Sequence, residues 1–503
     1  MGAPEVYSAW RNGQEMAMER LLGSKKKFIV LALPTGVGKS LVAMTHAIFS
    51  GKRTAYLTST KGLQDQVLQD FQSAGLVDIR GMSNYDCRLL GDERRPSHCA
   101  NGPCLDGEKC RYRDRGCDYF EAMATAKASK LVVTNYAKWL TARASEDGGL
   151  GKFDLVICDE AHETAAEVSG FLRAEFSGAE IGLPPDAEQW GLGEWRKWAT
   201  VEGAKVEKLL ERHGKGPRGR ELRDLKDLLD RVAVCGDDWV ADKTRKGWSL
   251  EPLWPGKYAS MLWEGAEQVV FASATIRPRT MEQLGLKPAD YEWIECPSPF
   301  AIGRRPILHV PSVKLSHRTD EGSLGIWLDR IDQIIEGRLD RKGIIHTVSY
   351  DRAKYLLRNS KWAAVMMSHE STSTRDVVAQ FKAMPAPAVL VSPSLHTGWD
   401  FPADLARYQI IAKVPWPDSR SKIVQGRTET DSDYPAYEAL TRIVQMAGRV
   451  VRGPEDWGET LIVDDQITWM LSKYRQHIPA WFREAYRSVA MVPQAPRPIG
   501  LAA

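Results

Sequence analysis

The feature that most limits the fold of this chain is a series of short apolar runs, each followed by a turn and then by a helical pattern. The first set comprises Phe28–Leu33, Thr54–Leu57, Leu131–Val133, Leu155–Ile157 and Gln268–Phe271. The second set comprises Gly343–Ile345, Val389–Val391, Gln409–Ala412 and Leu461–Val463. Continuous apolar runs that alternate with helices are typical of parallel strands buried on both faces. The sequence therefore predicts two α/β domains, each built on a parallel sheet.

Length and composition set broad limits on the class of protein. The chain has 503 residues, 43% hydrophobic and 26% charged, which excludes a fibrous or wholly disordered protein. The net charge is only +3, so any nucleic-acid surface must be a local groove. No apolar run approaches the ~18–20 residues that span a bilayer, and the N-terminus does not have the pattern of a secretory signal. We therefore expect a cytoplasmic protein with no membrane partner.

Two stretches interrupt the strand–helix rhythm and are predicted to be insertions in the first domain. Residues 86–118 contain five of the eight cysteines, where even scatter would place fewer than one. Residues 163–265 contain two groups of apolar residues at helical spacing, separated by a turn over 213–220, which predicts an antiparallel helical hairpin. The predicted ranges are 1–85, 119–162 and 266–300 for the first domain, 301–490 for the second and 491–503 for a loose tail.

Residues Leu33-Pro-Thr-Gly-Val-Gly-Lys-Ser40 stand between a predicted strand and a predicted helix, which is the context of a phosphate-binding loop. Backbone N–H groups at Thr35, Gly36, Val37 and Gly38 would wrap the phosphates of ATP. Lys39 would reach the β- and γ-phosphates, and the Ser40 hydroxyl would bind Mg²⁺. Leu33 departs from the strict pattern, which has Gly or Ala there. An incidental glycine-rich turn is therefore the alternative.

Two adjacent carboxylates follow the apolar run Leu155–Ile157 and Cys158. Asp159 is placed to hold Mg²⁺ through its hydration shell. Glu160 can polarise the attacking water as the general base of nucleotide hydrolysis. An acidic strand end that caps a helix is the alternative for such a pair taken alone. The presence of Lys39 and Ser40 upstream favours the hydrolytic interpretation.

A third element lies far downstream, at Gln445-Met-Ala-Gly-Arg-Val-Val-Arg452. Gln445, Arg449 and Arg452 are spaced i, i+4 and i+7, so on a helix they would share one face. Two guanidinium groups presented in this way suit a γ-phosphate approached from across a cleft. The alternative is a solvated basic helix face. The embedded Gly448 is unfavourable within a helix and indicates a close approach by a neighbouring segment.

Together these residues resemble the superfamily 2 helicases. Asp159-Glu-Ala-His162 is similar to the DEAH form of motif II, Ser273-Ala-Thr275 to motif III, and Gln445 to Arg452 to motif VI. The resemblance implies two RecA-like motor domains with ATP between them. It also adds Arg11 and Gln14, where a Q-motif would read adenine, and Asp400, within a Gly-Trp-Asp that stands where motif V would lie.

The two insertions resemble those of the XPD/DinG branch of iron–sulfur helicases. In that family four cysteines of the first insert bind a [4Fe–4S] cluster, and the second insert is called the arch. The resemblance implies Cys87, Cys104, Cys110 and Cys117 as the ligands. Cys99 is left over and could replace Cys104. Four soft thiolates also suit zinc, so spacing alone does not decide the metal.

The resemblance implies an ATP-dependent DNA helicase that moves 5′→3′ on single-stranded DNA, acts on forked duplex DNA and works as a monomer. An RNA-containing duplex is also a possible substrate. Two other functions are considered: a translocase that remodels protein–DNA complexes or R-loops, and a redox-sensing nucleic-acid-binding module. Seven of the 17 tryptophans lie in residues 163–265. They could stack on bases, but we expect most of them to form the core of this insert.

Overall fold

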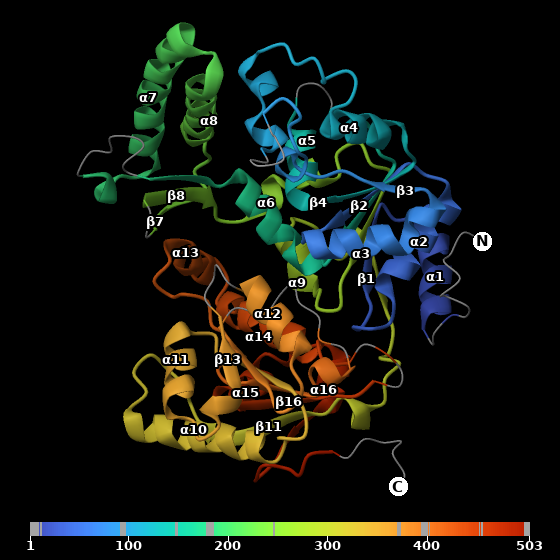
Figure 1. The fold of residues 1–503 in the computed structure, drawn as a ribbon, viewed down its shortest axis with the longest axis vertical. Coiled ribbons are helices and arrows are strands. Elements are labelled where there is room, and N and C mark those ends of the chain that lie inside the picture. The colour runs from blue at the N-terminus through green and yellow to red at the C-terminus, as the bar shows by residue number, and fades with distance from the viewer. Residues whose placement is uncertain are drawn as a thin grey trace.

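The computed structural model describes residues 10, 13–90, 97–145, 149–177, 186–244, 247–369, 374–393, 401, 403–451, 453 and 456–496. Its two largest bodies are α/β lobes, drawn one above the other in Figure 1, and each is built on a parallel sheet of seven strands. We call the N-terminal body lobe 1 and the C-terminal body lobe 2. This architecture confirms the predicted fold class of two RecA-like domains.

The sheet of lobe 1 has the strand order β10-β1-β9-β5-β2-β4-β3. The strands are β1 (Phe28–Ala32), β2 (Thr54–Thr58), β3 (Leu76–Asp78), β4 (Leu131–Asn135), β5 (Leu155–Asp159), β9 (Gln268–Ala272) and β10 (Tyr291–Glu295). Alternate residues of β1 enter different cores, with Ile29 and Leu31 on one face and Val30 and Ala32 on the other. The loops after β1, β9 and β5 therefore meet at one edge, since these three strands are adjacent and parallel.

Six helices described in lobe 1 accompany this sheet. They are α1 (Gln14–Gly23), α2 (Lys39–Ser50), α3 (Lys61–Phe71), α4 (Asp118–Ala128), α5 (Tyr136–Arg143) and α9 (Pro278–Gln283). Their caps follow ordinary rules: Thr60 accepts the Leu63 amide at the start of α3, and Asn135 accepts the Lys138 amide at the start of α5.

The sheet of lobe 2 has the order β13-β14-β12-β15-β16-β11-β17. Its strands are β11 (Ile307–Val313), β12 (Gly343–His346), β13 (Met366–Ser368), β14 (Val389–Ser392), β15 (Tyr408–Ile411), β16 (Glu459–Asp464) and β17 (Tyr486–Ser488). Its helices are α10 (Glu321–Glu336), α11 (Tyr350–Asn359), α12 (Thr374–Ala383), α13 (Lys422–Thr430), α14 (Tyr434–Ala447), α15 (Gln466–Lys473) and α16 (Ala480–Ala485). Among the described helices of the whole chain, none is long and apolar enough to cross a membrane.

All nine strands predicted from apolar runs are present, but five strands of the two large sheets were not predicted. These are β3, β10, β11, β13 and β17. All of them lie at or next to a sheet edge, and several mix polar and apolar residues, as in Tyr-Glu-Trp-Ile-Glu of β10. A strand with a partly solvated face does not show the continuous apolar run that identified the central strands.

The helical insert projects from lobe 1 as the hairpin of α7 (Leu192–His213) and α8 (Gly216–Ala233), at the upper left of Figure 1. The predicted hairpin is confirmed, but its turn is shorter than the predicted 213–220, because only Gly214 and Lys215 separate the two helices. Helix α8 already begins at Gly216, because Pro217 stands in its first turn, where a missing N–H costs nothing.

The base of this insert is a small antiparallel sheet that was not predicted. It has the order β6-β8-β7, from β6 (Ala174–Ser177), β7 (Trp239–Lys243) and β8 (Gly247–Pro252), and it follows α6 (Thr164–Leu172). We call it the base sheet. Four tryptophans form the core between this sheet and the hairpin, which confirms the core interpretation for them: Trp195, Trp198, Trp239 and Trp248. Trp263 is also buried, in the core of lobe 1.

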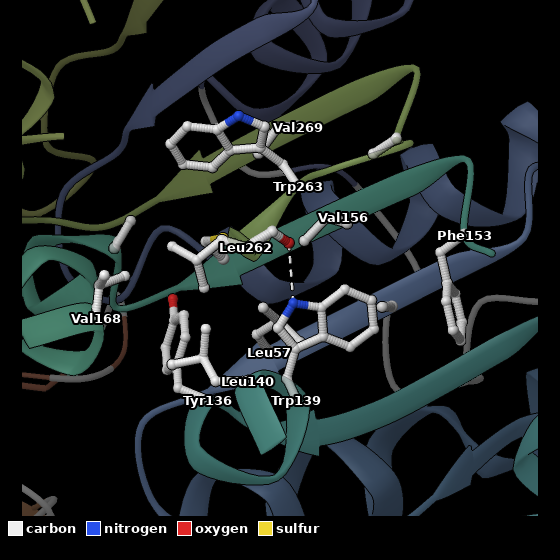
Figure 2. Close-up of a cluster of buried hydrophobic side chains, with 14 of the residues drawn as sticks. Leu57, Tyr136, Trp139, Leu140, Phe153, Val156, Val168, Leu262, Trp263 and Val269 are labelled. Carbon is white, nitrogen blue, oxygen red and sulfur yellow. Dashed lines mark hydrogen bonds between the residues drawn. The ribbon is translucent and has the colours of Figure 1, made fainter. Parts of the chain in front are cut away.

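Trp139 holds one face of the lobe 1 sheet together. Its indole lies between α5 and the sheet, where Leu57, Val156 and Val269 contribute side chains from three strands (Figure 2). The Trp139 Nε1–H donates a hydrogen bond to the Leu262 carbonyl at 2.9 Å, which ties the end of the helical insert to the core. The side chain is 1% exposed, so its apolar ring is buried in the core while its one polar atom has a hydrogen-bond partner.

We expect Trp139→Ala to lower the free energy of unfolding of lobe 1 by about 3–5 kcal/mol, because it removes a large buried side chain and leaves the Leu262 carbonyl without this donor. Urea denaturation followed by circular dichroism would measure the change. Trp469→Ala is the matched control, since Trp469 is 48% exposed. Equal effects of the two substitutions would contradict this account of the core.

Candidate active site between the two lobes

The loop between β1 and α2 has the backbone of a phosphate cradle. Gly36 and Gly38 have φ angles of 77° and 90°, in the left-handed region that glycine adopts without strain. Gly38 is the N-cap of α2, and Lys39 and Ser40 form its first turn, so the positive end of this helix faces the loop. The loop is therefore built as the sequence predicts, with backbone amides and Lys39 gathered at one helix end.

Gln14 lies directly on this loop. Its side-chain Nε2 donates a hydrogen bond to the Val37 carbonyl at 2.5 Å, and Gln14 is 2% exposed. A Cβ at Gly38 would lie 2.5 Å from the same Nε2, so only glycine fits there. The structure thus places Gln14 against the predicted phosphate loop, and its role in reading adenine stays a prediction. Arg11 lies outside the described residues.

The two predicted catalytic carboxylates stand at the end of β5, two strands from β1. Asp159 is 4% exposed, and its Oδ1 accepts the Glu160 amide at 2.9 Å. Burial raises the pKa of Asp159 to about 6, the Glu160 charge adds to the rise, and the Lys39 ammonium opposes it. A divalent cation at this carboxylate would favour its ionised form. Glu160 has a φ of 47°, a strained conformation of the kind found at active sites.

His162 contacts a residue of lobe 1 and a residue of lobe 2. Its Nδ1 lies 2.8 Å from the Ser273 hydroxyl, in the segment after β9. Its Nε2 pairs with the side-chain amide of Gln445, which α14 supplies from lobe 2. The sequence elements predicted as motifs II, III and VI are therefore in direct contact.

The last element, after α14, departs from its predicted conformation. Helix α14 ends at Ala447 with Gly448 as its C-cap, so Arg449 does not continue the helical face of Gln445 as predicted. Glycine has a low helix propensity, which suits the end of the helix here, and it also allows a close approach, since a Cβ at Gly448 would lie 2.7 Å from the Thr35 Oγ1 of the phosphate loop. Arg449, 9% exposed, follows directly at this interface between the lobes. Arg452 and Asp400 lie outside the described residues.

A cavity of about 670 Å³ lies between α6, at the start of the helical insert, and α14 of lobe 2, next to His162 and Gln445. It is lined by groups of both charges that the sequence analysis did not single out: Glu163, Glu167, Arg173, Glu438 and Arg442. Burial, followed by the Glu163 charge, raises the pKa of Glu167 to about 7. Glu438, Arg442 and Gln445 are spaced i, i+4 and i+7 on α14, so helical spacing from Gln445 was the signal that could have found them.

The five clustered cysteines line one common cavity, and all are free thiols. The Sγ atoms of Cys99 and Cys117 lie 3.9 Å apart, and a Cβ at Gly102 would lie 3.4 Å from the Cys104 sulfur and 3.6 Å from the Cys87 sulfur. No group of three or more His, Cys, Asp or Glu side chains in the described part of the chain could hold a metal ion as it stands.

The thiols of this cavity suit either a zinc ion or an iron–sulfur cluster by their chemistry. Four thiolates around one zinc ion at about 2.3 Å would lie about 3.8 Å apart. Cys99 and Cys117 have this spacing, but among the described side chains no third donor joins them around one point. A cluster distributes its thiolates over several irons and needs no such tight group. Burial, followed by the neighbouring thiols, raises the pKa of Cys99 to about 12, so binding of any metal there would displace a proton.

The cysteine-rich insert is attached to the α7–α8 hairpin by two arginines of α8, Arg220 and Arg223. Arg220 of α8 forms a two-pronged ion pair with Asp106, at 3.0 Å and 2.7 Å, and donates to the Ala100 carbonyl at 3.0 Å. Asp106 is 4% exposed. Arg223 adds a hydrogen bond to the Leu105 carbonyl at 2.9 Å. This contact, which we call the clasp, joins the two inserts without using either lobe.

We expect Gly448→Ala to reduce ATP turnover by about 100-fold, since a displacement of about 1 Å at the phosphate loop is enough for such a loss. Steady-state phosphate release would measure it. Gly325→Ala in α10 is the control, because a Cβ there would meet no other atom within 4 Å. Unchanged turnover in Gly448→Ala would contradict the close contact between the lobes.

Comparisons with known families match both lobes. Residues 343–485 match the family model described as a helicase C-terminal domain, and residues 8–183 match the one described as a type III restriction enzyme res subunit. The chain is 23% identical over 246 residues to the ATP-dependent DNA helicase DinG of Photobacterium profundum, covering 43% of this chain and 34% of that protein. It is 25% identical over 174 residues to a probable ATP-dependent helicase of Methanocaldococcus jannaschii, covering 28% of this chain and 26% of the relative.

Solved structures show the same fold over nearly the whole chain. An XPD helicase structure matches with a TM-score of 0.65 and 12% identity, covering 96% of this chain and 100% of that one. The Xpd4 structure of S. tokodaii matches with a TM-score of 0.63 and 13% identity, covering 95% and 100%. The matches to the two curated relatives span only about a third and a quarter of their lengths.

Proposed function

We propose that this chain, whose fold and motifs are those of an XPD/DinG-type superfamily 2 helicase, hydrolyses ATP to move along single-stranded DNA and to separate duplex DNA at a fork. The observation that carries the proposal is the meeting of Thr35 in the phosphate loop with Gly448 in lobe 2. A nucleotide held at Lys39 would lie at the interface of two separate bodies. Its binding and loss would therefore change how the lobes fit together.

Each residue has a stated role in this proposal. The loop from Thr35 to Gly38 and Gln14 would bind the nucleotide, with Arg11 and Asp400 as further contacts. Lys39 would neutralise the phosphates, while Ser40 and Asp159 would hold Mg²⁺. Glu160 would orient and deprotonate the attacking water. Gln445 would contact His162 when the two lobes close. Arg449 and Arg452 would stabilise charge on the transferred phosphoryl group.

The domain division is part of the proposal. The two lobes are the motor, residues 86–118 are the iron–sulfur insert, and residues 163–265 are the arch. The strand would lie across both lobes and would be gripped through its phosphodiester backbone, which carries no sequence information. The 5′→3′ direction, the preference for DNA over an RNA-containing duplex and action as a monomer are proposed from the resemblance.

We expect Lys39→Ala to abolish ATP binding and turnover. Glu160→Gln should keep ATP binding and lower turnover by about 10²–10⁴-fold, because only the proton acceptor is lost. Phosphate release with and without single-stranded DNA, combined with equilibrium binding of a fluorescent ATP analogue, would measure both steps. Normal turnover in Lys39→Ala would refute the site, and turnover at zero in the native chain would favour a nucleic-acid-binding module without a motor.

A separate assay distinguishes strand separation from movement along a single strand. Unwinding of forked duplexes with a 5′ or a 3′ single-stranded tail, compared with displacement of a protein from single-stranded DNA, separates a helicase from a translocase. We expect unwinding of the fork with the 5′ tail. ATP-dependent protein displacement without unwinding would assign the chain to the translocase class instead.

The cysteine-rich insert is proposed to hold a [4Fe–4S] cluster through Cys87, Cys104, Cys110 and Cys117. The bound cluster would cross-link an insert whose described residues contain only short 3₁₀ turns and an isolated β-bridge before α4 begins at Asp118. Cys99 is the alternative to Cys104, since both line the same cavity.

We expect protein purified without oxygen to be brown and to contain iron. Cys110→Ser and Cys117→Ser should bleach it, whereas Cys235→Ser, a buried thiol of the arch, should leave the colour unchanged. Visible absorbance and metal analysis are the measurements. A comparison of Cys99→Ser with Cys104→Ser identifies the fourth ligand. We expect Cys104→Ser to lose the brown colour and Cys99→Ser to keep it. A colourless protein with one bound zinc would overturn the cluster assignment.

A further inference from the structure

Helix α13 belongs to lobe 2 by sequence, but much of its packing is against the arch. The carboxylate of Asp242, on β7 of the base sheet, accepts the Ser421 hydroxyl at 2.8 Å and the Lys422 backbone amide at 2.9 Å. Ser421 is the N-cap of α13 and Lys422 its first residue. The arch therefore supplies the acidic cap of a helix in the other lobe, where a carboxylate meets the positive end of the helix dipole.

Further contacts continue along the helix. A Cβ at Gly426 would lie 2.9 Å from a methyl group of Leu253, so the backbone of α13 packs closely on the segment after β8. Arg427 donates to the Leu253 carbonyl at 2.7 Å and lies over the rings of Trp254 and Tyr434. The Trp254 indole in turn donates to the Thr430 hydroxyl at 3.0 Å.

By contrast, α13 makes few packing contacts with the core of lobe 2. None of its nine residues, all described, is fully buried, and none belongs to a core cluster of that lobe. A hydrogen bond from Arg427 to the Tyr434 hydroxyl, at 3.0 Å, ties it to α14, and Tyr434 also stacks edge-on against Trp254. Figure 1 shows α13 at the top of lobe 2, facing β7 and β8.

We propose that α13 is a transmission element that makes the arch move with lobe 2 when the lobes close on nucleotide. This inference rests on the proposed function, because it needs an ATP-driven movement of the lobes. The arch is inserted in lobe 1 by sequence, and the clasp also holds its hairpin to the cysteine-rich insert, so these two connections alone would keep it with lobe 1. The Asp242 cap and the Leu253 contacts instead bind its base to lobe 2, and the α7–α8 hairpin turns the displacement of that base into a larger displacement of its tip.

Asp242 is a positioning residue in this proposal, since it touches neither nucleotide nor the proposed strand. Substitution of Asp242 should lower strand separation without lowering ATP turnover. A purely structural role would lower both. ATP turnover stimulated by single-stranded DNA should stay within about twofold of the native value in Asp242→Ala and Asp242→Lys. The number of base pairs opened per ATP hydrolysed should fall at least tenfold in Asp242→Lys, which places a positive charge at the positive end of α13.

Fluorescence energy transfer tests the movement directly. One label pair, at Glu19 of α1 and Asp329 of α10, reports closure of the lobes. A second pair, at Glu19 and Arg212 near the end of α7, reports the arch; all three side chains are exposed. With a non-hydrolysable ATP analogue and Mg²⁺, we expect both signals to change in the native chain. In Asp242→Lys the first change should persist, and at least half of the second should be lost.

Glu175→Lys is the matched control, because Glu175 is an exposed carboxylate on β6, at the opposite edge of the base sheet. It should behave as the native chain in both label pairs. An arch signal that is constant while the lobes close, or one that persists in full in Asp242→Lys, would overturn the inference. Lobes that do not respond to the nucleotide analogue would overturn the proposed function, and the inference with it.

Discussion

The contact between the end of α14 and the phosphate loop is the constraint on which the rest of the site depends. Gly448 has no side chain, and a Cβ there would come within 2.7 Å of Thr35. Because the two segments can meet, Gln445 reaches His162 and Arg449 follows at the same interface. Lys39 begins the helix that follows β1, and Asp159 and Glu160 lie at the end of β5, two strands away in the first sheet. One half of the proposed catalytic residues thus belongs to lobe 1, and the other half belongs to lobe 2.

The two inserts also contact each other, and one of them contacts lobe 2. The arch is held at its base by Asp242 to a helix of lobe 2 and along α8 by Arg220 to the cysteine-rich insert. Its own core of tryptophans makes it a body that can turn as a unit. Asp106 is buried and Arg220 is partly exposed, and a two-pronged arginine–carboxylate pair is geometrically specific, so the clasp favours one relative position of the two inserts. The lobes, the arch and the insert therefore form a set of packed bodies joined by a few polar contacts.

Much of the fold and of the nucleotide site could be predicted because the signals are local. The run before Leu33, the glycines of the loop and the pair Asp159–Glu160 each depend on residues within one strand and one turn, and each was found where it was expected. The end of α14 was not predicted, because the spacing of Gln445 and Arg449 describes a helix only if nothing stops it. The edge strands were missed for lack of continuous apolar runs. The cap that Asp242 provides joins residues 180 positions apart, so no local pattern could reveal it.

The clasp also has a consequence for how the protein is made. Asp106 and the cysteines around it leave the ribosome 114 residues before Arg220, the residue that later holds this segment. At a synthesis rate of about 5–20 residues per second, the interval is roughly 6 to 23 s. During that interval the segment around Asp106 lacks the guanidinium group that later pairs with it. The cysteine-rich insert therefore reaches its final packing only after a helix that has yet to be translated arrives.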